Sequence, residues 1–214
     1  MKIVTAGAIA MLGIVCAISC SDIDTEGEKE SIYDKMEAVD LGLSVKWASC
    51  NLGASSPEEP GELYAWGETT TKEEYLATNY KWYDEELGRL TKYCPEDGKT
   101  ELEKEDDVAF VKTKGKWRLP TGKEVDELVK KCTTVTKKAN GIEGSLFVSE
   151  NGASIFIPRA YIVSSTIEVK YWTSGGSIYL NYGNFHGQGD NTNRTKGHPI
   201  RPVQDYSIEE LLKK

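Results

Sequence analysis

The pattern of apolar and polar residues changes along the chain, and it predicts both strands and helices. Apolar and polar residues alternate at 39–48 and at 177–182, which is typical of strands with one buried face. Shorter apolar runs predict further strands at residues 62–66, 145–149, 153–157, 170–173 and 198–203. Asn151-Gly152 separates two of these runs, and this pair favours a type I′ hairpin turn.

The clearest helix signal follows Thr121. Thr121 and Glu124 have the spacing of a capping box, in which each side chain bonds the other residue's backbone amide. An apolar stripe then continues at i, i+3, i+4 and i+7, through Val125, Leu128, Val129 and Cys132. A second capping pair, Ser207 and Glu210, predicts a short tail helix within residues 207–214.

Long polar segments separate these elements. Residues 51–61 are rich in turn formers, and residues 69–105 predict an irregular surface excursion with a helical turn near residues 72–75. Many short strands, few helices and long loops together predict an α+β domain.

The N-terminus has the pattern of an export signal. Residues 1–19 have one charge, Lys2, ahead of an apolar run that is too short to span a bilayer. The run ends in Ala17-Ile-Ser-Cys20, which resembles a bacterial lipobox, where the signal is cleaved before an acylated cysteine. An ordinary signal peptide is the alternative. We therefore expect a signal peptide at 1–19 and lipid attachment at Cys20.

Residues 21–30 are polar and acidic and form part of a predicted tether at 20–36. An acidic stretch after the lipid cysteine is similar to the surface-export signal of lipoproteins from the Bacteroides group. This similarity implies a protein anchored to outer-membrane lipid and facing the cell surface. A linker with no sorting role is the alternative.

Composition and charge exclude several classes of protein. The net charge of −8 argues against nucleic acid as a partner, since such binding needs a basic surface. Two histidines and five cysteines without ligand spacing argue against a zinc cluster. If Cys20 is acylated, Cys50, Cys94 and Cys132 remain and allow at most one disulfide.

Tryptophans are spread through the predicted strands and their flanks. Large rings dominate core burial, so we expect Trp47, Trp66, Trp117 and Trp172 to be core residues. Trp82 lies in the irregular excursion, and we expect it to be exposed.

Several segments together resemble the Fibrobacter succinogenes major paralogous domain, over about residues 37–206. They are Val39–Ala54, Tyr64–Glu68, Glu105–Ala109, Trp117–Thr121, Tyr171–Ser174 and Ile200–Val203. That family looks like a branch of the C-type-lectin-like fold, and the segment Arg118–Glu124 is similar to one in formylglycine-generating enzymes. The resemblance implies a domain that presents loops, and it implies no particular activity.

We expect no catalytic residue, metal or cofactor. A formylglycine-generating oxidase needs a late cysteine pair, yet no cysteine follows Cys132, and a related iron enzyme needs three histidines. The acids Glu105-Asp106-Asp107 fit a helix or turn cap, or a solvated run. They and residues 189–193 lack the ligand spacing of calcium-binding loops.

The segment 179–196 is the best candidate for ligand contact. It is rich in Tyr, Asn, Gly and Gln, a composition similar to that of recognition loops. In related C-type-lectin-like proteins, the segment ahead of the final strand forms the binding face. A merely soluble polar hairpin is the alternative. The candidate contacts are Tyr179, Asn181, Asn184, His186, Gln188, Asp190 and Asn191.

The sequence thus favours a non-catalytic surface lipoprotein that acts as a binding module or adhesin for a glycan or a protein. A structural or accessory subunit of a fimbria-like surface assembly is the alternative, and an enzyme of unknown type comes third.

Cys20→Ala tests the anchor. Without its acyl acceptor, the chain should lose radiolabelled fatty acid and leave the membrane fraction of the producing cell. Ser21→Ala, which keeps the cysteine, is the control. Unchanged membrane retention of Cys20→Ala would contradict the lipid attachment.

Overall fold

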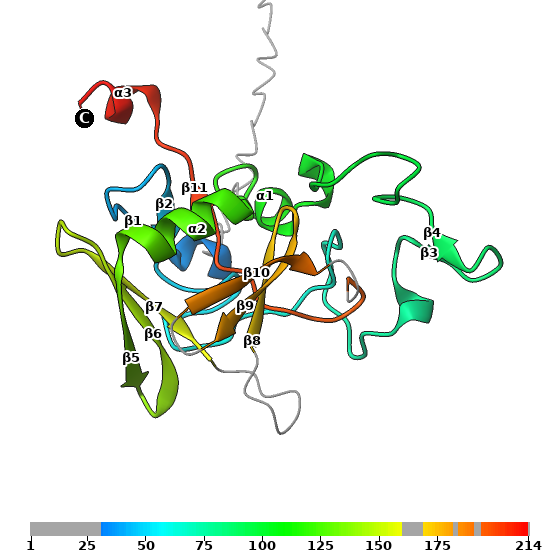
Figure 1. Cartoon of the computed structure of the whole chain (residues 1–214), viewed down its shortest axis with the longest axis horizontal. Coiled ribbons are helices and arrows are strands. Elements are labelled where there is room, and N and C mark those ends of the chain that lie inside the picture. The colour runs from blue at the N-terminus through cyan, green and yellow to red at the C-terminus, as the bar shows by residue number, and fades with distance from the viewer. Residues whose placement is uncertain (1–30, 160–168, 182–183, 191–193, 214) are drawn as a thin grey trace, which may run out of the picture. The chain divides into compact units, whose positions relative to one another are not determined.

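Strand pairing joins the beginning of the domain to its end. The computed structural model describes residues 31–159, 169–181, 184–190 and 194–213 (Figure 1). Its first sheet has the antiparallel order β1-β2-β11, in which Trp47 of β2 pairs with both Val39 and Val203. The strands are β1 (Ala38–Val39), β2 (Lys46–Ala48) and β11 (Val203–Gln204).

The single strand predicted at 39–48 is wrong, because the segment folds back on itself. Gly42 has a φ of 69°, and its amide donates to Asp40 Oδ1 at 2.8 Å, which closes a turn between β1 and β2. The strand predicted at 198–203 is also shorter than expected. His198 forms only an isolated bridge with Tyr64, and regular pairing begins at Val203.

The second sheet has the order β5-β6-β7, and the sequence did not reveal its first strand. The strands are β5 (Thr133–Ala139), β6 (Ile142–Val148) and β7 (Ser154–Pro158). The type I′ geometry lies at Asn140-Gly141, with φ values of 47° and 84°. The type I′ turn predicted at Asn151-Gly152 is wrong, since only Gly152 has a positive φ there. The Gly152 amide donates to the Ser149 carbonyl at 3.0 Å instead.

The third sheet, of order β10-β9-β8, contains the predicted late strands. It consists of β8 (Val169–Thr173), β9 (Gly176–Asn181) and β10 (Asn184–Asp190). The excursion at 69–105 is mostly irregular, as expected, but it also contains the two-stranded hairpin β3 (Tyr83–Asp84) and β4 (Arg89–Leu90). Its helical turn is η2 (Ala77–Asn79), not residues 72–75. Two more 3-10 turns are η1 (Ile32–Lys35) and η3 (Lys104–Asp106).

Three short helices complete the described elements: α1 (Val108–Lys112), α2 (Gly122–Lys131) and α3 (Ile208–Leu211). Both predicted capping boxes are confirmed, Thr121 with Glu124 on α2 and Ser207 with Glu210 on α3. Asp107 caps α1 by accepting from the Phe110 amide at 3.0 Å. Together these elements confirm the α+β class.

Two buried clusters hold the sheets and helices together. One surrounds Trp47 and contains Leu128 of α2 and Phe147 of β6, while the other contains Trp66, Trp117 and Trp172. All four tryptophans are at most 1% exposed, which confirms their predicted core role. Trp82, by contrast, is partly buried against the second cluster, so the expectation of exposure is wrong. Cys50, Cys94 and Cys132 are free thiols.

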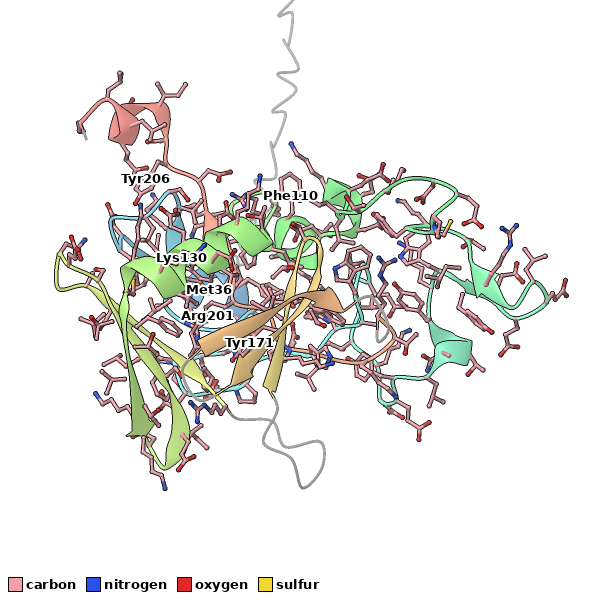
Figure 2. The ribbon with its side chains drawn as sticks, viewed as in Figure 1. Met36, Phe110, Lys130, Tyr171, Arg201 and Tyr206 are labelled. Carbon is pink, nitrogen blue, oxygen red and sulfur yellow. The ribbon has the colours of Figure 1, made fainter. Side chains whose placement is uncertain are left out.

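Arg201, which is labelled in Figure 2, is a fully buried cation that donates to neutral oxygens. Its guanidinium donates to Asn51 Oδ1 at 2.8 Å, to the Ala48 carbonyl at 3.0 Å and to the Phe156 carbonyl at 2.8 Å. Burial lowers its pKa to about 10. One side chain thus joins the end of β2, the loop after it, and β7.

Arg201→Lys should lower the free energy of unfolding by about 3 kcal/mol. The reason is that a lysine ammonium group cannot reach all three oxygens that the planar guanidinium group binds. Arg201→Met should cost a similar amount, since it leaves the same buried acceptors unpaired. Urea denaturation measures both. Arg89→Met on exposed β4 is the control and should change stability by less than about 0.5 kcal/mol. Wild-type stability of Arg201→Lys would contradict the role.

Candidate functional site

The structure places the backbone of most predicted contact residues in one antiparallel hairpin. In the pairing of β9 with β10, Asn181 lies opposite Asn184 and Tyr179 lies opposite His186. Gln188 and Asp190 follow on β10, beyond an irregularity in the register, and Asp190 pairs with Ser177. The side chains of these residues, and Asn191 as a whole, lie outside the described part of the structure.

This hairpin is attached to the core through β8. Tyr171 and Trp172 on β8 are buried, and the Trp172 indole N–H donates to the Tyr64 carbonyl at 2.6 Å. The Tyr171 hydroxyl donates to the Pro158 carbonyl at 2.8 Å. Among the described strands, β10 is at the edge of its sheet, and it lies beside α2 (Figure 1). The hairpin is therefore joined by strand pairing to β8, whose side chains Tyr171 and Trp172 are buried, and α2 lies beside it.

A groove of about 560 Å³ lies at a different place, between α1 and the C-terminal tail. Buried Trp117, Leu119 and Val203 line it, together with Phe110 from α1 and Tyr206 from the tail, both labelled in Figure 2. Its volume is within the range of small-ligand sites.

Two ion pairs fix the tail as one wall of the groove. Arg118 bonds both oxygens of Glu124, at 3.0 and 2.6 Å, and reaches Asp205 at 2.6 Å. These contacts, that with Glu124 foremost, raise the pKa of Arg118 above its usual range. Lys46 lies 2.8 Å from Glu210, and this hydrogen bond is the main reason that the pKa of Glu210 falls to about 2. The charges on this wall are thus paired.

The acids predicted as caps or as a solvated run have different environments. Asp107 is the one of the three that caps a helix, and its other oxygen accepts from the Leu119 amide at 2.8 Å, while burial raises its pKa. Asp106 is instead buried beneath Lys81, Lys92 and Tyr93, at 2.9, 2.6 and 2.6 Å. Burial alone would raise the pKa of Asp106, but these three hydrogen bonds lower it. Glu105 is exposed, as a solvated residue is.

Sequence reasoning missed the groove. Its walls come from segments far apart in the chain, and Arg118 and Asp205 are 87 residues apart. The Trp117–Glu124 segment was identified from its capping pattern, but nothing in its local sequence indicates the partner in the tail. The available signal was a charged residue, Arg118, directly before the buried Leu119.

Among the residues that the structure describes, no three His, Cys, Asp or Glu side chains gather as a metal site would require. In the same part of the chain, no helix is long and apolar enough to cross a bilayer. No family model, curated protein or solved structure matches the chain. The geometry alone therefore defines an α+β domain with two candidate contact regions, the late hairpin and the groove.

Proposed function

We propose that this protein is a non-catalytic binding module with a C-type-lectin-like fold, displayed as a lipoprotein on the cell surface. The observation that carries the proposal is that the polar β9–β10 hairpin is joined by strand pairing to the buried strand β8. β10 lies at the edge of a sheet whose other outer strand, β8, is fixed in the core by Tyr171 and Trp172. Rigid scaffolds that position polar loops are typical of recognition surfaces.

Two features of the topology support the C-type-lectin-like fold. First, the early strands β1 and β2 form one sheet with the last strand, β11. Second, the long and mostly irregular segment 69–105 lies between β2 and α1 in the chain. The late sheet β10-β9-β8 directly precedes β11 in the chain, as the resemblance to the paralogous-domain family implies for a binding face.

The buried acids support a non-catalytic role, because each has a structural function. Asp106 neutralises two lysines and Asp107 caps α1. Glu68 binds Lys72 at 2.7 Å and accepts from the Lys81 amide at 2.6 Å. Acids used in this way are held in one protonation state, whereas general acid–base catalysis requires proton exchange.

The anchor and tether complete the proposal. An acylated Cys20 would anchor the protein in the outer-membrane lipid. Residues 20–36 would act as a flexible tether that holds the domain away from the membrane surface. The ligand would be a glycan or a protein at the cell exterior.

The triple variant Asn184→Ala, His186→Ala and Gln188→Ala tests the hairpin. If β10 contacts the ligand, binding on a glycan array or in a pull-down with surface extracts should fall at least tenfold, because several polar contacts of about 1 kcal/mol each are lost. Glu85→Ala, Glu86→Ala and Arg89→Ala, on the β3–β4 hairpin, form the matched control. Full binding by the β10 variant would remove this hairpin from the site.

One observation favours the alternative of a surface-assembly subunit. Among the described strands, β5 pairs only with β6, so its outer edge is open. Ala139 and Ile142 flank the two-residue turn at Asn140-Gly141 and form a hydrogen-bonded pair. Along β5, residues whose backbone N–H and C=O groups point toward β6 alternate with residues whose groups point away from it. The backbone groups of Thr134 and Thr136 therefore point away from β6, toward the open edge. Such an edge can accept an added strand.

The side chains of β5 fit a second copy of the same strand. In an antiparallel pairing centred on Val135, which is 49% exposed, the two valines would meet and Thr134 would face Thr136. Lys137 would face Thr133, so no lysine opposes a lysine directly. Lys138 already has Glu143 at 3.3 Å. Lysines protect edge strands from pairing, but here both lie near the hairpin tip.

Cysteine cross-linking tests this register, in a Cys94→Ser background. Val135→Cys alone should form a disulfide dimer on mild oxidation, because residue 135 of one copy would lie opposite residue 135 of the other. Thr133→Cys and Lys137→Cys should cross-link when mixed but not separately. Non-reducing gels read the result. No cross-linking, or equal cross-linking of every variant, would contradict the pairing.

A further inference from the structure

The lining of the groove contains lysines that form no ion pair among the described residues. Lys104 and Lys116 line it, and neither lies within ion-pair distance of a carboxylate in the described structure. Lys112 and Lys114, on the same turn, also have no ion pair there. In a chain of net charge −8, Lys112, Lys114 and Lys116 thus form a local basic stretch beside the groove, whereas Lys104 lies in an acidic run.

The groove lining also presents an unpaired acceptor. Glu101 lines the groove, is exposed, and has no ion pair among the described residues. Its carboxylate would repel a purely anionic ligand such as a polyphosphate. It would bind hydroxyl groups, which donate to carboxylates. A ligand with both anionic oxygens and hydroxyl donors would therefore match this lining.

Two buried polar atoms of the lining residues have no hydrogen-bond partner. They are the indole Nε1 of Trp117 and the hydroxyl of Ser174. An unsatisfied buried donor costs about 1–3 kcal/mol, so a ligand oxygen that reached it would recover that free energy. The Trp117 side chain is 1% exposed, so its ring is not a stacking platform.

Phe110 is not a stacking platform either. The Lys104 ammonium lies over its ring at 5.4 Å from the centroid. The ring also lies against Gly115, where an added Cβ would be 3.2 Å from Cζ. Recognition in this groove therefore depends on charge and hydrogen bonds rather than on ring stacking.

We infer that the groove between α1 and the tail binds an acidic oligosaccharide. Uronate carboxylates would pair with Lys104 and Lys116, and sugar hydroxyls would donate to Glu101. A volume of about 560 Å³ suits a short saccharide segment. The inference rests on the proposed binding function but names a site other than the β9–β10 hairpin.

Titration of the full chain with tetragalacturonate, followed by tryptophan fluorescence and calorimetry, tests the inference. The double variant Lys104→Gln and Lys116→Gln should weaken binding at least tenfold, because charge-assisted contacts are the strong ones. Its thermal stability should be nearly unchanged, since neither lysine has an ion pair to lose and Lys104 gives up only its contact with the Phe110 ring. Glu101→Gln should weaken binding by less, about threefold, because an amide oxygen still accepts.

The control variant Lys137→Gln and Lys138→Gln removes the same charge from the β5 hairpin and should bind within about twofold of wild type. The methyl ester of tetragalacturonate should bind at least tenfold more weakly than the acid. Equal binding of the ester, or full binding by the Lys104/Lys116 variant, would overturn the inference. Tripolyphosphate that bound as tightly as the uronate would also overturn it, since it would show general attraction of anions.

The two proposals fail separately. The β10 triple variant should keep tetragalacturonate binding if the groove is the site. Loss of that binding in the β10 variant, with full binding in the Lys104/Lys116 variant, would assign the saccharide to the hairpin and overturn the groove. Tetragalacturonate binding that needs the lysines supports the groove even if the hairpin proves inert.

Discussion

The three hydrogen bonds of buried Arg201 are the constraint on which the arrangement of the sheets depends. A buried guanidinium must have its donors satisfied, and here neutral oxygens from β2, the following loop and β7 satisfy them. Because the fork is planar and rigid, it fixes these three segments relative to one another. Asn51 extends the constraint, since its amide donates to the Tyr171 hydroxyl at 3.2 Å and so connects β8 to the same group.

Both candidate contact regions follow from this arrangement. Tyr171 positions β8, and β8 supports the β9–β10 hairpin through strand pairing. On the other side, the chain continues from Arg201 directly into Val203 of β11, which lines the groove, and then into Asp205, which binds Arg118. A displacement at Arg201 would therefore alter the base of the hairpin and the wall of the groove together.

Local signals predicted part of this structure, and long-range contacts account for the rest. The caps at Thr121 and Ser207 were predictable because capping depends on nearby residues, and the buried tryptophans were predictable because a large ring favours burial. β5 was not, since its Thr- and Lys-rich sequence is mostly exposed and lacks an apolar face. The groove was not, because its ion pairs join Arg118 to the tail. The late segment was predicted as a recognition segment, with a polar hairpin as the alternative; its backbone pairs as the β9–β10 hairpin, and its contact side chains lie outside the described residues.

Asp107 is a buried acid in the lining of the groove, and its hydrogen bonds give it a structural role. Burial raises its pKa, which is a property of many catalytic acids, and it lies in the lining of the groove. Yet one of its oxygens caps α1 through the Phe110 amide, and the other accepts from the Leu119 amide. Protonating Asp107 would weaken both bonds and loosen the start of α1 together with the groove floor. An acid in this position thus keeps the start of α1 and the Leu119 segment of the groove lining together, so the shape of the groove depends on its staying ionised.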